Sequence, residues 1–254
     1  IAGGERDDAP LGAVLEASLA NGEGLTRGAT LTPVVTDGTQ DYPVEFESFR
    51  LVERGNHNQR LSMRLEGSVR IDRKTVQVFL EYRLSDDRHA LLIATQLASE
   101  HSVELAAGLA VRWGGHTPFV PGHGLVMRAL ATAAPVIGAD MRAAEGITGA
   151  AVYASRAPMA VRVETEQHGA FEELAQTSVS VAPAPLGQRA RTQGFGLVLS
   201  PYGLADAVRR VIYERFDCSL GTGLGKVRGR EAVEHLACGQ DVLPRQPYAM
   251  AGIK

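Results

Sequence analysis

Residues 112–124 form the densest group of side chains in this chain that could recognise a ligand. The segment reads Arg-Trp-Gly-Gly-His-Thr-Pro-Phe-Val-Pro-Gly-His-Gly and holds the only tryptophan and two of the seven histidines. Its glycines and prolines favour an irregular path, which is typical of a binding loop. The side chains that we expect to contact a ligand are Arg112, Trp113, His116, Phe119 and His123.

The indole ring of Trp113 has two interpretations. An exposed indole can stack on a sugar ring, because it covers apolar area while the polar rim of the sugar stays hydrated. Alternatively, Trp113 ends a strand inside the core, and Phe119 covers it. The exposure of the indole separates the two, since stacking on a ligand requires at least part of the ring to be accessible.

The two histidines of this segment do not form a recognised metal site. His116 and His123 lie seven residues apart on a predicted loop, and no third ligand is apparent. The chain also lacks the His-Glu-x-x-His motif of zinc hydrolases. The glycine-rich run at 221–226 lacks the residue order of a phosphate-binding loop. We therefore predict no metal and no cofactor.

A second group of residues could perform acid–base chemistry, which needs titratable groups held beside a substrate. Glu164, Glu166 and His168 occupy alternate positions, so they share one face of a predicted strand. On a concave sheet they would form an acid–base patch; the alternative is the hydrated face of an outer strand. His101, with Glu104 close by in the sequence, is a further candidate.

The elements that position these residues are predicted to be strands, and residues 76–84 show this most clearly. The segment Val-Gln-Val-Phe-Leu-Glu-Tyr-Arg-Leu is apolar at every second position and polar at most positions between. Successive side chains of a strand point to opposite faces, so one face is dry and the other mostly hydrated. A hydrated face is typical of an antiparallel sheet. Residues 61–71 alternate similarly and are predicted to pair with 75–84 as a hairpin.

Strand patterns separated by turn signals recur over most of the chain, which favours a sandwich or barrel. Residues 114–124 are expected to be a loop, residues 11–20 a short helix or an edge strand, and residues 125–150 carry no clear pattern. Residues 202–216 instead repeat apolar positions as an amphipathic helix does. We predict a mainly β protein: a large antiparallel β-sandwich over residues 1–200, with a C-terminal amphipathic helix and irregular tail at 201–254 packing on it.

Composition excludes several classes of partner and site. The chain has 254 residues and a net charge of −3, so no positive field recruits nucleic acid. No apolar run approaches the roughly 20 residues that span a bilayer.

Cys218 and Cys238 either form a disulfide, worth roughly 3 kcal/mol, or remain two thiols. Because the first residue is Ile1, we expect a processed product or a piece of a longer protein, and processing favours a secreted or periplasmic location.

Two segments together resemble a known family. They are the strand patterns at 76–84 and 91–97, the latter reading Leu-Leu-Ile-Ala-Thr-Gln-Leu, and the Val-Arg-Trp-Gly-Gly-His-Thr-Pro-Phe-Val-Pro-Gly-His-Gly run that follows. Over residues 60–200 this pattern resembles the galactose-mutarotase-like β-supersandwich domains found beside metal-dependent phosphoesterase domains in secreted bacterial proteins. The resemblance implies a large antiparallel sandwich with a carbohydrate-facing or accessory role. Neither the catalytic His and Glu of the mutarotases nor the phosphoesterase metal motifs have a match here, which favours a non-catalytic module.

Three functions follow as hypotheses. The first is a non-catalytic binding or accessory module of a bacterial envelope or secreted protein, which contacts a glycan or a neighbouring domain through residues 112–124. The second is a carbohydrate-active enzyme of mutarotase or lyase type, whose acid and base come from His101, Glu164, Glu166 and His168. The third is a structural subunit that docks on a partner through the 202–216 helix, which requires the face carrying Val208 and Ile212 to be uncovered.

Overall fold

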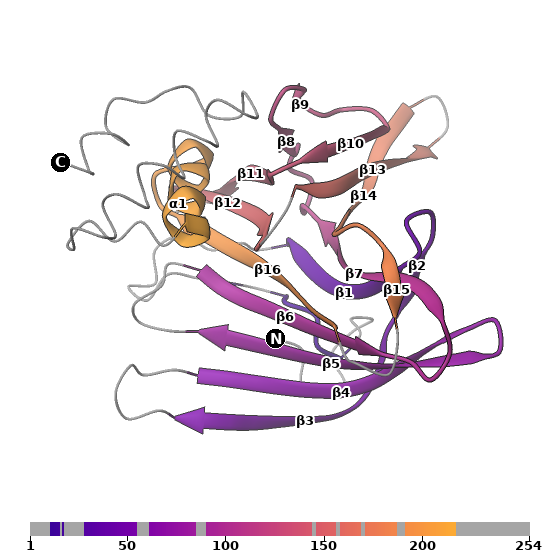
Figure 1. The fold of residues 1–254 in the computed structure, drawn as a ribbon. Helices are drawn as coiled ribbons and strands as arrows, with labels where there is room; N and C mark the ends of the chain where they lie inside the picture. The colour runs from indigo at the N-terminus through magenta and orange to yellow at the C-terminus, as the bar shows by residue number, and fades with distance from the viewer. Residues whose placement is uncertain are drawn as a thin grey trace.

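The computed structural model describes residues 11–15, 17, 28–54, 61–84, 90–143, 146–155, 158–168, 171–186 and 191–216. Over these residues the chain is mainly β. Two antiparallel sheets face each other, and one helix follows the last strand (Figure 1). The predicted antiparallel β-sandwich with a helix after it is therefore confirmed.

The smaller sheet has seven strands within the described ranges, in the order β10-β13-β14-β7-β1-β2, with β15 also paired to β7. Their bounds are β1 (Thr30–Thr36), β2 (Asp41–Pro43), β7 (Val103–Arg112), β10 (Leu130–Ala134), β13 (Met159–His168), β14 (Phe171–Ser180) and β15 (Ala184–Leu186). All of these pairings are antiparallel. Neighbours such as β7 and β14 lie far apart in sequence, so the sheet forms only when the whole chain folds.

The larger sheet has nine strands in the same ranges, in the order β3-β4-β5-β6-β16-β12-β11-β8-β9. Their bounds are β3 (Glu45–Arg54), β4 (Leu61–Ile71), β5 (Lys74–Leu84), β6 (Ala90–Ala98), β8 (Phe119–Val120), β9 (Gly124–Leu125), β11 (Val136–Ala143), β12 (Gly146–Ala154) and β16 (Arg191–Ser200). The helix, α1 (Leu204–Phe216), lies beside β12 and β16 (Figure 1).

The β4–β5 hairpin follows the predicted alternation. Its register pairs Leu65 with Leu80 and Val69 with Val76, and all four side chains are buried. The turn places Asp72 at a φ of 54°, the left-handed conformation that tight hairpin turns use. The opposite face of β5 is hydrated, as the sequence predicted.

The main core fills the space between the two sheets. The smaller sheet contributes side chains such as Leu109 and Val111, and the larger sheet contributes Leu80, Ile93 and Phe195. Each of these is nearly inaccessible to solvent. Their burial fixes which face of every strand points inward, because a shift of one residue would turn the apolar side chains outward.

The helix α1 covers the outer face of the larger sheet over β11, β12 and β16. Val208 and Val211 are buried there in one cluster with Ala151 and Val198. Asp140 Oδ1 accepts a hydrogen bond of 2.6 Å from the Leu204 backbone N–H at the start of the helix. The hypothesis of a structural subunit requires the face of α1 that carries Val208 and Ile212 to be uncovered. Val208 instead packs on the chain's own sheet, and the side chain of Ile212 lies outside the described residues.

Several segments differ from the sequence-based expectation. Residues 114–124, predicted to be a loop, contain the short strands β8 and β9, and residues 125–150, which carry no clear pattern, contain β10 and β11. Around Val14 only an isolated bridge to Leu31 forms. Residues 217–254, including both cysteines, lie outside the described part of the chain. No helix of the described part is long and apolar enough to cross a membrane.

Candidate binding site

Trp113 is a core residue and not a stacking platform. Its side chain is only 6% exposed and belongs to the cluster between the sheets. The indole Nε1–H donates a hydrogen bond of 3.1 Å to Thr177 Oγ1, which is itself buried. The condition set for sugar stacking, partial exposure of the ring, is therefore not met.

The other residues expected to bind with Trp113 do not converge on a cavity described here. Arg112 and His123 are exposed, whereas His116 and Phe119 are half-buried. The His123 ring lies 3.2 Å from Thr132 Oγ1, and Phe119 pairs with Leu125 across the short β8–β9 ladder. None of them lines either of the two cavities described below.

The acid–base patch on β13 is part of a hydrated face of the smaller sheet, in which β13 lies between β10 and β14. Glu164 and Glu166 are exposed, and Glu164 Oε1 lies 2.7 Å from Nε of Arg162. The same guanidinium lies 3.0 Å from Asp41 Oδ2. Glu164 is thus held in an ion-pair network, and the side chain of His168 lies outside the described residues.

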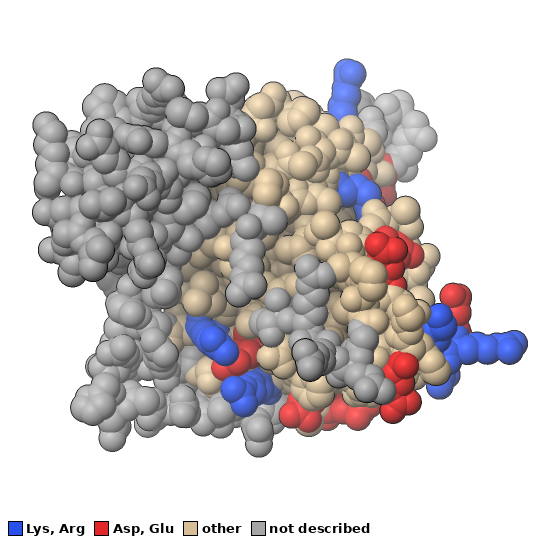
Figure 2. Space-filling view, viewed as in Figure 1, with Lys and Arg blue, Asp and Glu red and all other residues tan. Residues whose placement is uncertain are grey.

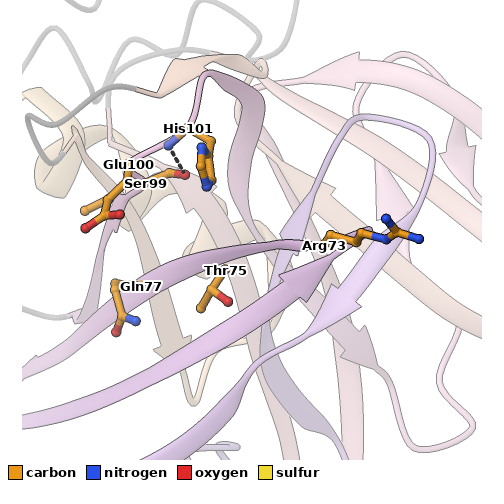
Figure 3. Close-up of a pocket in the computed structure, with 7 residues that line it drawn as sticks. Arg73, Thr75, Gln77, Ser99, Glu100 and His101 are labelled. Carbon is orange, nitrogen blue, oxygen red and sulfur yellow. Dashed lines mark hydrogen bonds between the residues drawn. The ribbon is translucent and has the colours of Figure 1, made fainter.

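His101 stands apart from these carboxylates, at the turn between β6 and β7. Its backbone N–H donates a hydrogen bond of 3.1 Å to Ser99 Oγ, and its side chain lines a cavity of about 550 Å³. In Figure 3, Thr75 and Gln77 project from β5 on one side of this cavity, and the side chains of the turn lie on the other. Glu104, expected as a companion of His101, is not among the lining residues, which are Arg73, Thr75, Gln77, Ala98, Ser99, Glu100 and His101.

The residues that the structure describes contain neither a hydrogen-bonded pair of a histidine and a carboxylate nor a group of metal ligands. No hydrogen bond joins a histidine to a carboxylate in these ranges, although Glu100 and His101 line the same cavity. The described ranges also contain no group of three His, Cys, Asp or Glu side chains that could hold a metal ion.

A second cavity of about 350 Å³ opens on the outer face of β4, β5 and β6. Phe79 lies in it with 38% of its surface exposed, although it belongs to the middle of a long strand. The other lining residues are mostly polar or small: Arg64, Leu65, Glu66, Leu80, Glu81, Arg83, Ala94 and Gln96. Charges of both signs gather along the lower margin of Figure 2, where β3–β6 lie in Figure 1.

The carboxylate of Glu81 is fixed in this cavity by two guanidinium groups. Arg83 donates a hydrogen bond of 2.7 Å to Glu81 Oε2, and Nε of Arg64 lies 3.6 Å from the same oxygen. The hydrogen bond from Arg83 is the main cause that holds the pKa of Glu81 below its ordinary value, with the positive charges adding to it. The cavity therefore presents an ionised carboxylate and two cations around one aromatic ring.

One feature of the sequence marks this site. Along 76–84 every other position between the apolar residues is polar, except Phe79. An aromatic residue at a position that the alternation assigns to solvent does not point into the core. Phe79 is 38% exposed and lies among charged side chains in a cavity, and this setting makes it a candidate contact.

Comparisons with known proteins give a limited result. No family model matches the sequence, and no curated protein does. Solved structures with a similar fold include a variant of the GH36 alpha-galactosidase AgaA from Geobacillus stearothermophilus in complex with stachyose (14% identity, 79% of this chain and 33% of that chain, TM-score 0.49). The alpha-galactosidase from Lactobacillus brevis gives 10% identity, 79% and 33% coverage and a TM-score of 0.48.

A third similar structure is the Slr1438 protein from Synechocystis sp. PCC 6803, with 14% identity, 63% and 66% coverage and a TM-score of 0.38. The present chain spans about a third of the length of the alpha-galactosidase structures. The β-sandwich implied by the family resemblance is confirmed by the strand pairings of this chain. At this level of similarity, only the residues of this chain bear on its function.

Proposed function

We propose that this protein is a non-catalytic carbohydrate-binding module, and that it contacts its glycan through the outer face of β4, β5 and β6. The observation that carries the proposal is the exposed ring of Phe79 in a cavity that also holds the Arg64–Glu81–Arg83 cluster. We call this surface the Phe79 face. It replaces residues 112–124, whose tryptophan is buried, as the place of contact.

The chemistry of the Phe79 face matches the two sides of a sugar ring. The C–H face of a sugar is apolar and can lie on an aromatic ring, while its hydroxyl groups stay at the rim. Carboxylates accept hydrogen bonds from hydroxyl groups, and a guanidinium donates several from one plane. Glu81 is already oriented by Arg83, so binding would lose little side-chain freedom there.

The electrostatics of Glu81 support binding more than catalysis. A general acid or base works best with a pKa near the operating pH, which for a glutamate requires an upward shift. The pKa of Glu81 is shifted downward, because Arg83 hydrogen-bonds the charged form. The carboxylate thus serves as a fixed hydrogen-bond acceptor. The resemblance to galactose-mutarotase-like domains points to the same ligand class, and an accessory role in a bacterial envelope or secreted protein belongs to this proposal.

A glycan array followed by calorimetry on the glycans that bind would test the proposal. Phe79→Thr keeps a residue that favours strands but removes the ring, and it should weaken binding at least about tenfold, which corresponds to 1.4 kcal/mol. Tyr202→Thr is the matched control, because Tyr202 is another exposed aromatic, 79% accessible, in the turn before α1. Its affinity should equal that of the wild type.

Three results would contradict the proposal. If the intact protein binds no glycan on an array that covers the common linear and branched types, the ligand class is wrong. If a glycan binds and Phe79→Thr binds it as well as the wild type does, the Phe79 face is not the site. Equal losses in Phe79→Thr and Tyr202→Thr would also count against a specific role of Phe79.

A further inference from the structure

The two cavities described above lie on one face of the same strands. Phe79 pairs directly with Gln96 across β5 and β6, and both line the smaller cavity. Gln77 pairs with Ala98, and both line the larger one. These are successive pairs on the same face, separated by two residues along each strand, or about 7 Å. The cavities are therefore neighbours along the strands.

Together the cavities follow β5 over a considerable length. The residues of β5 that line the two cavities run from Glu81 to Thr75. These positions are six residues apart along the strand, which is about 20 Å. Each cavity, at about 350 Å³ and 550 Å³, falls within the range of a small-molecule site. Two such sites in line offer room for more than one sugar unit.

The two cavities differ in chemistry. The smaller one contains the phenyl ring of Phe79, whereas the larger one is lined mainly by hydrogen-bonding groups, and its one aromatic lining group is the imidazole of His101. Thr75, Gln77 and Ser99 offer neutral hydrogen bonds there (Figure 3). A linear polymer rich in hydroxyl groups fits both, since one unit can stack while the following units are held by hydrogen bonds.

We infer that the ligand is a linear chain of several sugars that lies along β5. One unit covers Phe79, and the next units occupy the cavity beside Gln77 and His101. The inference rests on the proposed function and adds to it the length and the direction of the glycan. It also assigns a binding role to His101, which the sequence analysis considered only as an acid or base.

Length dependence of the affinity tests the inference. Soluble cello-, xylo-, manno-, malto- and galacto-oligosaccharides, each from the monosaccharide to the hexasaccharide, are titrated by calorimetry. For the series that binds, affinity should rise at least about tenfold between the shortest binding member and the hexasaccharide, equivalent to 1.4 kcal/mol. Equal affinity along the series would overturn the inference and leave the Phe79 face intact as a site for a single unit.

A blocking variant locates the added affinity. Ala98 is half-buried and lines the larger cavity, one same-face residue pair along the strands from Phe79, so the large side chain of Ala98→Trp should fill that cavity. Long chains should then bind only as tightly as short ones, and short chains should bind as they do to the wild type. The matched control is Ala131→Trp, at an exposed position of β10 in the other sheet, which should change neither.

The outcomes separate the two proposals. If Ala98→Trp retains the full gain with chain length, the longer glycans extend in another direction and the inference is wrong. If short and long chains lose affinity equally in Ala98→Trp, the larger cavity is not a separate contact and the inference is again wrong. If no member of any series binds the wild-type protein although the array yields a glycan that does, the inference is wrong and the proposed function stands; if the array yields none either, both fail.

Discussion

Trp113 and Phe79 are two aromatic residues of the same sandwich, and they occupy opposite situations. Trp113 follows a strand in a segment rich in glycine, proline and histidine, yet it is 6% exposed and hydrogen-bonded to Thr177. Phe79 lies in the middle of a regular strand, yet it is 38% exposed. The difference shows that the glycine and proline content of a segment does not predict the exposure of its side chains, whereas the position of a residue in the strand alternation does.

The glycines around Trp113 explain why its segment was misleading. Gly114 has a φ of 60°, and a side chain there would come within 2.7 Å of the backbone of Gly28. The glycine is therefore required for a close approach of two chain segments, and this packing holds the loop against the sheet. A segment rich in glycine can thus be closely packed and not a mobile binding loop.

The largest effect is expected from removing the indole. Trp113→Ala should lower the free energy of unfolding by about 3–5 kcal/mol, the usual cost of replacing a buried aromatic residue by alanine. Chemical denaturation followed by circular dichroism measures it. A loss below about 1 kcal/mol would mean that the ring is not part of the core.

A smaller loss is expected when the hydrogen bond to the indole is removed. Thr177→Val keeps the shape of the side chain but leaves the buried Nε1–H without its acceptor. The unfolding free energy should fall by about 1–3 kcal/mol, which is the desolvation cost of an unsatisfied buried donor. The double variant Trp113→Phe with Thr177→Val should lose less stability than the sum of the two single variants, and strict additivity would contradict the pairing.

The exposed aromatic should contribute much less to stability. Phe79→Thr should change the unfolding free energy by no more than about 1 kcal/mol, because the position is an open strand site and threonine also favours strands. The same denaturation experiment used for Trp113→Ala measures it. A loss as large as that of Trp113→Ala would remove the contrast between the two residues.

The smallest effect concerns the carboxylate beside Phe79. Because the folded pKa of Glu81 is lowered, its contribution to stability is present above its ordinary pKa of 4.5 and is lost as the pH falls below it. Arg64 and Arg83 are 44% and 55% exposed, so solvent screening limits the contribution to about 0.5 kcal/mol.

Glu81→Gln isolates this contribution by comparison with the wild type. Denaturation at pH 7 and at pH 3 should show a difference between the two proteins that shrinks at the lower pH. Asp206 also has a lowered pKa and acts in both proteins, so its contribution cancels in the comparison. A difference that grows as the pH falls would contradict the assigned direction of the Glu81 shift.

Much of the fold could be predicted from the sequence where a strand has one dry and one hydrated face. The β4–β5 hairpin and the helix belong to this group. The strands β11 and β12 could not, because Ala139, Ala151 and their neighbours are buried whichever face they point to. One face of these strands packs against the smaller sheet, and the opposite face packs against α1. Both faces are therefore apolar, and the sequence shows no alternation of apolar and polar residues there.

The candidate site could be predicted only in part. His101 is a candidate from the sequence, but the sequence does not show that it lines the same cavity as Gln77, because that arrangement depends on the pairing of β5 with β6. Glu164 is also a candidate from the sequence, but its carboxylate forms an ion pair with Arg162, which the sequence does not show. The register of a sheet brings residues from distant turns together, and this information is spread over the whole chain.

The contact between α1 and β12 limits what residue 149 can be. A side chain at Gly149 would come within 2.1 Å of the backbone of Gly203, just before the helix. Even one methyl group would lift the helix from the sheet and uncover the apolar surface around Ala151 and Val198. That surface adjoins the strands proposed to hold the glycan, so the altered protein would adhere to its own copies and lose ligand through self-association.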